Sequence, residues 1–328
     1  MNIRTDWTLE EIREIYNRPL LDLMFEAATI HRENNAYGEV QISSLISIKT
    51  GGCKEDCSYC PQSIKFNTDI TVHPLMQLAE VKRKALTAKE NGASRVCMGA
   101  SWREVRDNRD FDRVLEMVKE VNDMGIEVCC TLGMLTYEQA QKLKESGCFA
   151  YNHNIDTSRD YYDKIITTRN FDDRLETLDN VRKAQMTVCC GGIIGLGETD
   201  EDRIQMLHTL STLEVHPDSV PINALVPVKG TALENNKRIN IDEMVRMIAT
   251  ARILMPKSVV RLSAGRNEMS LAEQAMCFMA GANSIFAGEK LLTTPNPDID
   301  EDMRMFKMLG LKPRAPFKDV QKLEEVEA

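Results

Sequence analysis

The 328-residue sequence lacks several features that would place it in specialised classes of protein. Residues 1–17 are charged throughout and contain neither an apolar core nor a cleavage site, so we do not expect a secretory signal. No apolar run is long enough to span a bilayer. The net charge of −9 argues against a nucleic-acid partner, which normally binds a basic face. We therefore expect a cytoplasmic protein without membrane or nucleic-acid partners.

A linker rich in Pro, Gly or Ser is also missing, so nothing in the composition divides the chain into separate globular units. Cysteine, by contrast, occurs ten times. In a reducing compartment, cysteines serve as metal ligands, catalytic groups or buried core residues more often than as disulfides. Their positions are therefore the first place to look for chemistry.

Short apolar, β-branched runs alternate with amphipathic helical runs along most of the chain. The expected strands are 43–49, 94–100, 126–133, 149–156, 187–195, 219–225, 258–265 and 283–288. Several helices between them end at a glycine, which supplies the left-handed conformation that stops a helix: Gly92, Gly125, Gly147 and Gly281. Eight strands alternating with helices predict a (β/α)8 TIM-type barrel rather than an open sheet.

Regions with other patterns flank this barrel. Thr8 and Glu11 form a capping-box pattern that begins an N-terminal helical extension. We therefore expect an extension over 1–36, the barrel over 37–292, and a C-terminal segment over 293–328 that packs on the barrel. The polar end of that segment is expected to fray.

Three cysteines follow the first expected strand in a C-x3-C-x2-C array, Cys53, Cys57 and Cys60. Three thiolates so close in sequence can converge on one metal centre, and no second pair lies nearby to complete a four-ligand zinc site. A three-cysteine [4Fe–4S] cluster would keep one iron open for a small molecule. This spacing after a first barrel strand is the signature of the radical S-adenosylmethionine (SAM) superfamily.

Strand alternation predicts which residues enter the barrel lumen, because outward residues must meet apolar helix faces. This rule places Cys97, Cys129 and Cys189 inside and their neighbours Cys130 and Cys190 outside. Several polar residues also point inward: Arg95, Asn152, Asn154, Asp156, Asn223, Arg261 and Ser263. Each cysteine alone could be a small buried hydrophobe. Together with an arginine they favour a second metal site, of the iron–sulfur type.

Nearly the whole sequence resembles the biotin synthase family within the radical SAM superfamily. The matching stretches are SIKTGGCKEDCSYCPQS, RVCMGASW, CTLGML, YNHNIDTS, IITTR, GGIIGLGET, VPINALVPVKGT, VRLSAGR, QAMCFMAGANSIF and KLLTTPNP. A long series of matches in order is far more specific than the cysteine array alone. The doubled cysteines at the third and fifth strands depart from the family pattern, so an altered second cluster is the competing interpretation.

The resemblance implies a radical SAM conversion of dethiobiotin to biotin. A 5′-deoxyadenosyl radical removes hydrogen from dethiobiotin, and a [2Fe–2S] cluster donates the sulfur. Cys53, Cys57 and Cys60 would hold the [4Fe–4S] cluster that binds SAM. The second cluster would be held by Cys97, Cys129, Cys189 and Arg261. Since a guanidinium stays protonated, chemistry alone makes Arg261 a hydrogen-bond donor to the cluster, and only the resemblance makes it a ligand.

The resemblance also assigns residues around the two clusters. Tyr59 would lie near the adenine of SAM, and Asn154, Asp156 and Asn223 would contact dethiobiotin or SAM. The GGIIGLGE element would place Gly191, Ile193, Gly195 and Glu198 near the adenosine. The implied partners are a flavodoxin- or ferredoxin-type electron donor, the iron–sulfur assembly machinery, and a second copy of the chain in a homodimer.

Two alternatives stay open at this point. Another radical SAM enzyme of similar architecture, such as a hydrogenase-cluster maturase or an amino-acid mutase, would keep the cysteine triplet. It would have no need of three lumen cysteines and an arginine. A non-catalytic, zinc-binding scaffold is the alternative from a different class, and it would be colourless where an iron–sulfur protein is brown.

Overall fold

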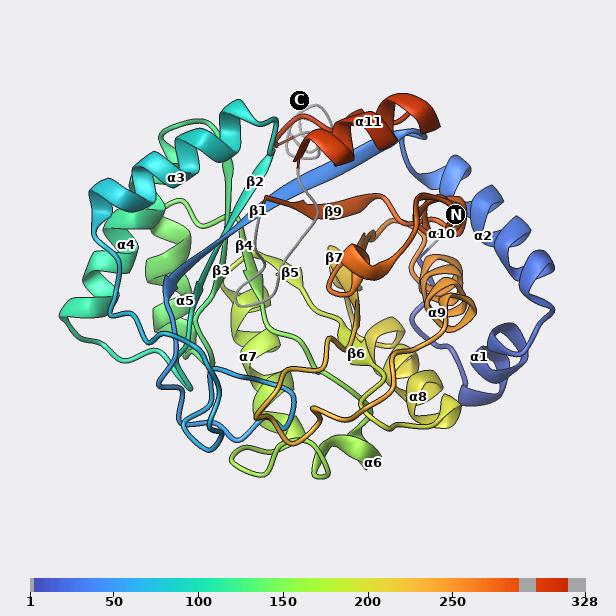
Figure 1. Ribbon diagram of the computed structural model, residues 1–328, viewed down its shortest axis with the longest axis horizontal. Helices are drawn as coiled ribbons and strands as arrows, with labels where there is room; N and C mark the ends of the chain where they lie inside the picture. The colour runs from blue at the N-terminus through green and yellow to red at the C-terminus, as the bar shows by residue number, and fades with distance from the viewer. Residues whose placement is uncertain (1–2, 289–298, 318–328) are drawn as a thin grey trace.

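The computed structural model describes residues 3–288 and 299–317, which form a closed barrel of parallel strands surrounded by helices (Figure 1). The eight barrel strands follow each other in the order β1-β2-β3-β4-β5-β7-β8-β9, and β9 pairs with β1 to close the ring. Their bounds are β1 Glu39–Lys49, β2 Arg95–Ala100, β3 Glu127–Thr131, β4 Ala150–Asn152, β5 Thr187–Cys189, β7 Ser219–Ala224, β8 Val259–Leu262 and β9 Ser284–Ala287. The predicted TIM-type barrel is confirmed.

One predicted strand is interrupted. The run 187–195 forms two short strands, β5 and β6 (Gly192–Ile194), which both pair with β7. The break lies opposite Pro221, which has no N–H to donate to the ladder, because Cys189 pairs with Ser219 and Gly192 with Ile222. At Gly191 the backbone of β7 comes so close that a Cβ atom would lie 2.0 Å from the Pro221 oxygen. The chain therefore leaves and rejoins the sheet at this point.

Helices cover the outside of the barrel. They are α3 Leu78–Glu90, α4 Arg109–Asn122, α5 Tyr137–Glu145, α6 Arg159–Tyr162, α7 Phe171–Lys183, α8 Asp200–Ser211, α9 Ile241–Leu254 and α10 Leu271–Met279, with a 3-10 turn over Arg266–Glu268. The helix-ending glycines predicted from the sequence have positive φ angles, as at Gly147 (φ 92°). Within residues 3–288 and 299–317, no helix combines the length and apolar character that crossing a bilayer requires.

The N-terminal extension consists of α1 (Leu9–Tyr16) and α2 (Leu20–Asn34). The capping box is present, since the Thr8 hydroxyl accepts from the Glu11 N–H and the Glu11 carboxylate accepts from the Thr8 N–H. Helix α1 packs against α8, and α2 packs against α9. The extension therefore covers the barrel on the side of its later helices.

The C-terminal part begins with α11 (Ile299–Leu309), which leads to β10 (Lys312–Pro313). Strand β10 pairs in parallel with the first residues of β1. The KLLTTPNP stretch at 290–297 and the expected boundary between 292 and 293 lie outside the described residues, as does the polar end that was expected to fray.

Side-chain alternation sorts the strand residues into two separate apolar clusters. The large cluster between barrel and helices contains the outward residues, including Cys130 and Cys190. A small second cluster lies in the lumen and consists of Cys97, Cys129 and Ala150, with Leu45, Phe149 and Phe286 packed against it. Cys97 in β2 and Cys129 in β3 therefore face the lumen, as predicted. Cys130 and Cys190 face the helices, also as predicted.

Candidate active site

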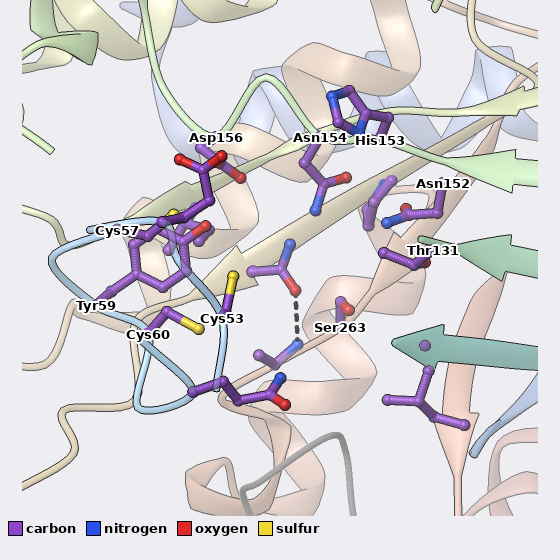
Figure 2. A pocket seen from close by; sticks show the side chains of 18 of the residues that line it. Cys53, Cys57, Tyr59, Cys60, Thr131, Asn152, His153, Asn154, Asp156 and Ser263 are labelled. Carbon is purple, nitrogen blue, oxygen red and sulfur yellow. Dashed lines mark hydrogen bonds between the residues drawn. The ribbon is translucent and has the colours of Figure 1, made fainter. Parts of the chain in front are cut away.

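A cavity of about 340 Å3 opens at the carboxyl ends of the strands. Residues from the loop after β1 line it together with residues from the ends of β2, β3, β4, β6, β7 and β8. Loops at this end of a parallel barrel converge on one space, so residues far apart in sequence meet there. Figure 2 shows Cys53, Cys57, Tyr59 and Cys60 on one side of the cavity, facing Asn154, Thr131 and Ser263.

The cysteine triplet lies on a loop that its own backbone holds in shape. The N–H of Cys53 donates to the Gln62 carbonyl at 3.0 Å, and the N–H of Cys60 donates to the Cys57 carbonyl at 2.9 Å. The Asp56 carboxylate accepts from the N–H groups of Thr167 and Thr168, at 2.9 and 3.2 Å. The loop is therefore anchored to the segment after α6 before any cofactor binds.

All ten cysteines are free thiols, and those of the triplet border the cavity. Burial raises the pKa of Cys57 to about 12 and that of Cys60 to about 11. A bound iron would reverse this, because a metal-coordinated thiol loses its proton. The donors therefore suit a cationic metal centre that supplies the charge the site lacks.

The number of these donors bears on the kind of metal centre. A structural zinc ion needs four donors around a single point. A [4Fe–4S] cluster held by three thiolates keeps one iron open. The three thiols of the loop border one cavity and fit such a cluster.

Asn154 and Asp156 follow β4 and reach the cavity wall. The predicted strand 149–156 ends at Asn152, and the chain then turns, with Asp156 at a positive φ of 67°. The buried Asp156 carboxylate forms an ion pair with Arg174, whose Nε also donates to the Tyr162 hydroxyl at 2.9 Å. Asp156 is thus held by a cation from α7.

Two of the predicted site amides brace the backbone around the break in the fifth strand. The Asn154 Oδ1 accepts from the Gly191 N–H at 3.2 Å, and the Asn223 Nδ2 donates to the Gly192 carbonyl at 2.9 Å. Tyr59 and Ile193 also line the cavity. The Asn223 Oδ1 also accepts from the Ala264 N–H at 3.2 Å. These contacts fix both amides at the cavity wall.

Three of the four residues predicted from the GGIIGLGE element do not line the cavity. Gly191 allows the close approach to β7, and Gly195 has a positive φ of 94°. The Glu198 carboxylate accepts from the Gly195 N–H at 2.8 Å and pairs with Arg203 at 2.7 Å. The structure thus places these residues in the turn that carries Ile193 to the cavity.

The second group of cysteines lies deeper in the lumen. Cys97 faces the cavity, pairs in register with Cys129 and is beside it in the lumen cluster. A hydrogen bond with the Cys129 thiol lowers the pKa of Cys97 to about 7, and the guanidinium groups of Arg261 and Arg95 act in the same direction. The same hydrogen bond, together with burial, raises the pKa of Cys129.

Arg261 connects Cys189 to this group. The buried guanidinium donates from Nη1 to the Cys189 sulfur at 3.8 Å and from Nε to the Ser284 hydroxyl at 3.0 Å. Its Nη2 donates to Gln41 and Ser43, both at 3.3 Å. The structure therefore places the Arg261 guanidinium as a hydrogen-bond donor to a thiol sulfur, with neutral partners around it.

Sequence reasoning missed several residues of the site. Glu55 is buried within the cysteine loop, lines the cavity and lies 3.5 Å from Arg103. Arg169 belongs to the IITTR stretch but received no role, and it also lines the cavity. Arg174 carried no signal, because its helix has an ordinary amphipathic pattern. His153 also borders the cavity. Its buried ring lies near the ring of the outward-facing Tyr151, with the two ring centroids 6.5 Å apart.

The chain is similar to known proteins over nearly its whole length. The Radical SAM superfamily model matches residues 47–210, and the Biotin and Thiamin Synthesis associated domain model matches residues 221–312. The biotin synthase of Cytophaga hutchinsonii is 64% identical over 317 residues, which cover 97% of this chain and 94% of that protein. The mitochondrial biotin synthase of Arabidopsis thaliana is 59% identical over 314 residues, covering 95% and 83%.

Two solved structures resemble the fold at lower identity. Methylornithine synthase superposes with a TM-score of 0.80 at 21% identity, covering 94% of each chain. The [FeFe]-hydrogenase maturase HydG gives a TM-score of 0.80 at 20% identity, covering 93% of this chain and 72% of that one. At this level of identity the likeness concerns the fold alone.

Proposed function

This chain belongs to the biotin synthase family of radical SAM enzymes, and we propose that its two groups of cysteines hold two different clusters along one cavity. Its reaction is the insertion of sulfur into dethiobiotin to give biotin, and it is a sulfurtransferase that uses SAM, a [4Fe–4S] and a [2Fe–2S] cluster. The observation that carries the proposal is that Cys53, Cys57, Cys60 and Cys97 border the same cavity.

Cys53, Cys57 and Cys60 would hold the [4Fe–4S] cluster, and Cys97, Cys129 and Cys189 the [2Fe–2S] cluster. When bound, the first supplies the electron that cleaves SAM to a 5′-deoxyadenosyl radical, and the second supplies the sulfur. The protein contributes position and exclusion of water, because such a radical attacks most C–H bonds. The cavity that the triplet and Cys97 border would place both substrates beside the two cysteine groups.

The polar residues at the cavity wall would bind the two substrates. Asn154, Asp156 and Asn223 present amide and carboxylate groups to the cavity, and Tyr59 offers a ring for an adenine. Gly191, Ile193, Gly195 and Glu198 would shape the adenosine side, with only Ile193 bordering the cavity. Asp156 is acidic and already paired with Arg174, so it suits ribose hydroxyls rather than a second cation.

We propose that Arg261 acts as a charged donor to the second cluster rather than as a ligand that has lost its proton. The support is its hydrogen bond to the Cys189 sulfur and its neutral partners Gln41, Ser43 and Ser284. A cation here stabilises the added negative charge of thiolates and of a reduced cluster.

The reaction needs an electron donor, and we propose a flavodoxin- or ferredoxin-type protein that docks beside the cysteine loop. Lys54, Lys65 and Arg106 are exposed near this loop and would suit an acidic partner. We further propose that iron–sulfur assembly proteins rebuild the second cluster and that the chain forms a homodimer in the cytoplasm. We also propose that the chain consists of an N-terminal extension over 1–36, the barrel over 37–292 and a C-terminal segment over 293–328. Each of these extends the family assignment.

The test is anaerobic incubation of the reconstituted protein with SAM, a reductant and dethiobiotin, followed by mass spectrometry for biotin and 5′-deoxyadenosine. We expect both products, and neither from the matched Cys53→Ala protein. Formation of 5′-deoxyadenosine without biotin, when both clusters are present by absorption, would contradict the proposed substrate.

A further inference from the structure

Arg203 on α8 is a buried cation that does not line the cavity. Its Nε donates to the Glu198 carboxylate at 2.7 Å, and its Nη1 donates to Glu243 on α9 at 2.8 Å and to Asp200 at 3.3 Å. The Arg203 and Glu198 side chains are only 6% and 1% exposed. Removing one partner of such a pair leaves an uncompensated buried charge, so each holds the other in place.

Glu198 connects this cation to the turn after β6. The carboxylate oxygen that binds Arg203 also accepts from the Gly195 N–H at 2.8 Å. On its other side, the Gly195 carbonyl accepts from the Asn236 Nδ2 at 3.0 Å. Gly195 has a positive φ of 94°, a conformation that glycine adopts readily. Side chains thus bind both backbone polar groups of Gly195, and the position of the turn depends on the Glu198 carboxylate.

The turn follows directly on a stretch of the cavity wall. The Ile193 N–H donates to the Asp156 carbonyl at 2.7 Å, and the Ile194 carbonyl accepts from the Leu225 N–H at 2.9 Å. Ile193, Asp156 and Leu225 all line the cavity. A shift of the turn at Gly195 would therefore reach the part of the wall assigned to the adenosine of SAM.

Tyr16, at the end of α1, joins these contacts from the N-terminal extension. Its buried hydroxyl donates to the Asp200 Oδ1 at 3.1 Å, the same oxygen that accepts from Arg203. Burial raises the pKa of Tyr16 to about 12, so the hydroxyl keeps its proton at neutral pH. Figure 1 shows α1 (dark blue) beside α8. We call the contacts among Tyr16, Asp200, Arg203 and Glu198 the Arg203 network.

Arg13 provides a second contact between α1 and α8. Its Nη2 and Nε donate to the Glu201 carboxylate at 2.7 and 3.1 Å, and both side chains are partly exposed. Within residues 3–288 and 299–317, neither Arg13 nor Glu201 forms a hydrogen bond or ion pair with Arg203. A change at Arg13 therefore weakens the attachment of α1 while leaving the Arg203 network in place.

We propose that Tyr16 and Arg203 are positioning residues for SAM. They hold the turn at Gly195, and through it Ile193 and the Asp156 backbone, in the arrangement that accepts the adenosine. The inference rests on the proposed function, which places the adenosine beside Ile193. Neither Tyr16 nor Arg203 lines the cavity, so both act on SAM through Glu198 and the turn. The N-terminal extension is then part of the SAM-binding half of the site.

The first test measures backbone hydrogen exchange in the full-length chain without clusters. We expect Tyr16→Phe, which removes one hydroxyl, to raise the exchange rate of the Gly195 N–H about twofold to fivefold. Arg203→Lys cannot make all three contacts and should raise this rate further. Arg13→Met should leave the rate unchanged. The amides of β2 and β3, on another side of the barrel, should exchange at the parent rate in every variant.

The second test measures ligand binding to the protein with both clusters loaded and without reductant. We expect the Kd of SAM to rise about twofold to fivefold in Tyr16→Phe, the size of coupling that such networks carry, and further in Arg203→Lys. The Kd of dethiobiotin at saturating SAM should stay constant. In turnover, the KM for SAM should rise while kcat stays near the parent value. Arg13→Met should match the parent in each measurement.

Four outcomes would contradict the inference. An unchanged Gly195 exchange rate in Tyr16→Phe would show that the network does not hold the turn. Faster exchange with an unchanged Kd of SAM would show that the turn does not act on SAM. An equal rise in the Kd of SAM in Arg13→Met would assign the effect to the attachment of α1 alone. An equal rise in the Kd of dethiobiotin would indicate general loosening of the site.

Tyr16→Phe is the milder of the two changes and decides the question if Arg203→Lys does not fold. The exchange measurement uses the chain without clusters, so its result does not depend on the reaction. Absence of SAM binding by the parent protein would refute the proposed function itself. SAM binding by the parent that Tyr16→Phe leaves unchanged would refute only the role of the Arg203 network.

Discussion

The two groups of cysteines carry the same side chain on different kinds of support. The triplet lies on one short loop, which hydrogen bonds such as those of Asp56 fix to its surroundings. Cys97, Cys129 and Cys189 lie on three different strands, and only the closed barrel brings them into one lumen. A loop can place donors around an open position, whereas strands fix donors in a rigid, dry interior.

The electrostatics of the two groups differ as well. Burial raises the pKa values of Cys57 and Cys60, and no cation dominates their shifts. In the lumen, the hydrogen bond with the Cys129 thiol lowers the pKa of Cys97, and the guanidinium groups of Arg261 and Arg95 act in the same direction. The pKa of Cys129 is raised by the same hydrogen bond and by burial. The lumen thus favours one thiolate beside a neutral thiol, whereas burial favours the neutral form of Cys57 and Cys60 on the loop.

The largest expected effect comes from the loop. Replacing Cys53, Cys57 or Cys60 by alanine should reduce SAM cleavage to background, because a cluster with one open iron needs all three thiolates. The measurement is 5′-deoxyadenosine formed with reductant under anaerobic conditions. Production at the parent rate by any one of the three variants would show that the triplet does not hold the SAM-cleaving cluster.

Variants of the lumen cysteines should separate SAM cleavage from sulfur insertion. Alanine at Cys129 or Cys189 should remove the second cluster and biotin formation, while 5′-deoxyadenosine is still made on the intact loop. The ratio of 5′-deoxyadenosine to biotin, measured by mass spectrometry, checks this. If these variants also lose SAM cleavage while keeping their fold by circular dichroism, the two groups are not independent.

Arg261 should have a smaller effect, since it supports the second cluster without being one of its thiolates. In Arg261→Met we expect the triplet cluster and SAM binding to be unchanged. The second cluster should form with a shifted spectrum or potential, and biotin yield should fall. Arg261→Lys keeps a cation and should lie between this variant and the parent.

Elimination of the second cluster in Arg261→Met would make the arginine a required ligand and would refute its role as a donor. An unchanged spectrum, potential and yield would show that Arg261 does not act on the cluster, in spite of its hydrogen bond to Cys189.

The fold was predictable from the sequence because each barrel strand leaves a local signal. Apolar runs bounded by turn residues identified all eight strands, and alternation placed Cys129 inside and Cys130 outside. The break after Cys189 was not predictable, since it depends on Pro221 in a neighbouring strand that the sequence does not show to be opposite. Pairing across strands is a property of the closed barrel.

The site was predictable in proportion to how local its signals are. The triplet follows from its spacing alone. Asp156 was expected to face inward as part of a strand, and it reaches the cavity through a turn instead. Its partner Arg174 could not be predicted, because one arginine on an amphipathic helix gives no indication that it points inward.

The smallest expected effect concerns the doubled cysteines and is the sharpest test of the comparison. Cys130 and Cys190 are fully buried in the outer core, back to back with residues of the lumen. Alanine at either position removes one sulfur from a packed apolar region, which should cost about 1–2 kcal/mol of unfolding free energy. The absorption of the second cluster and the biotin yield should not change.

Denaturant unfolding of the cluster-free chain measures the loss of unfolding free energy. Cys277→Ala, which changes a buried cysteine on a helix, is the matched control. Loss of the second-cluster absorption in Cys130→Ala, with retention in Cys129→Ala, would reverse the assignment of the two faces. The side-chain direction within a strand would then no longer distinguish a cluster ligand from a core residue.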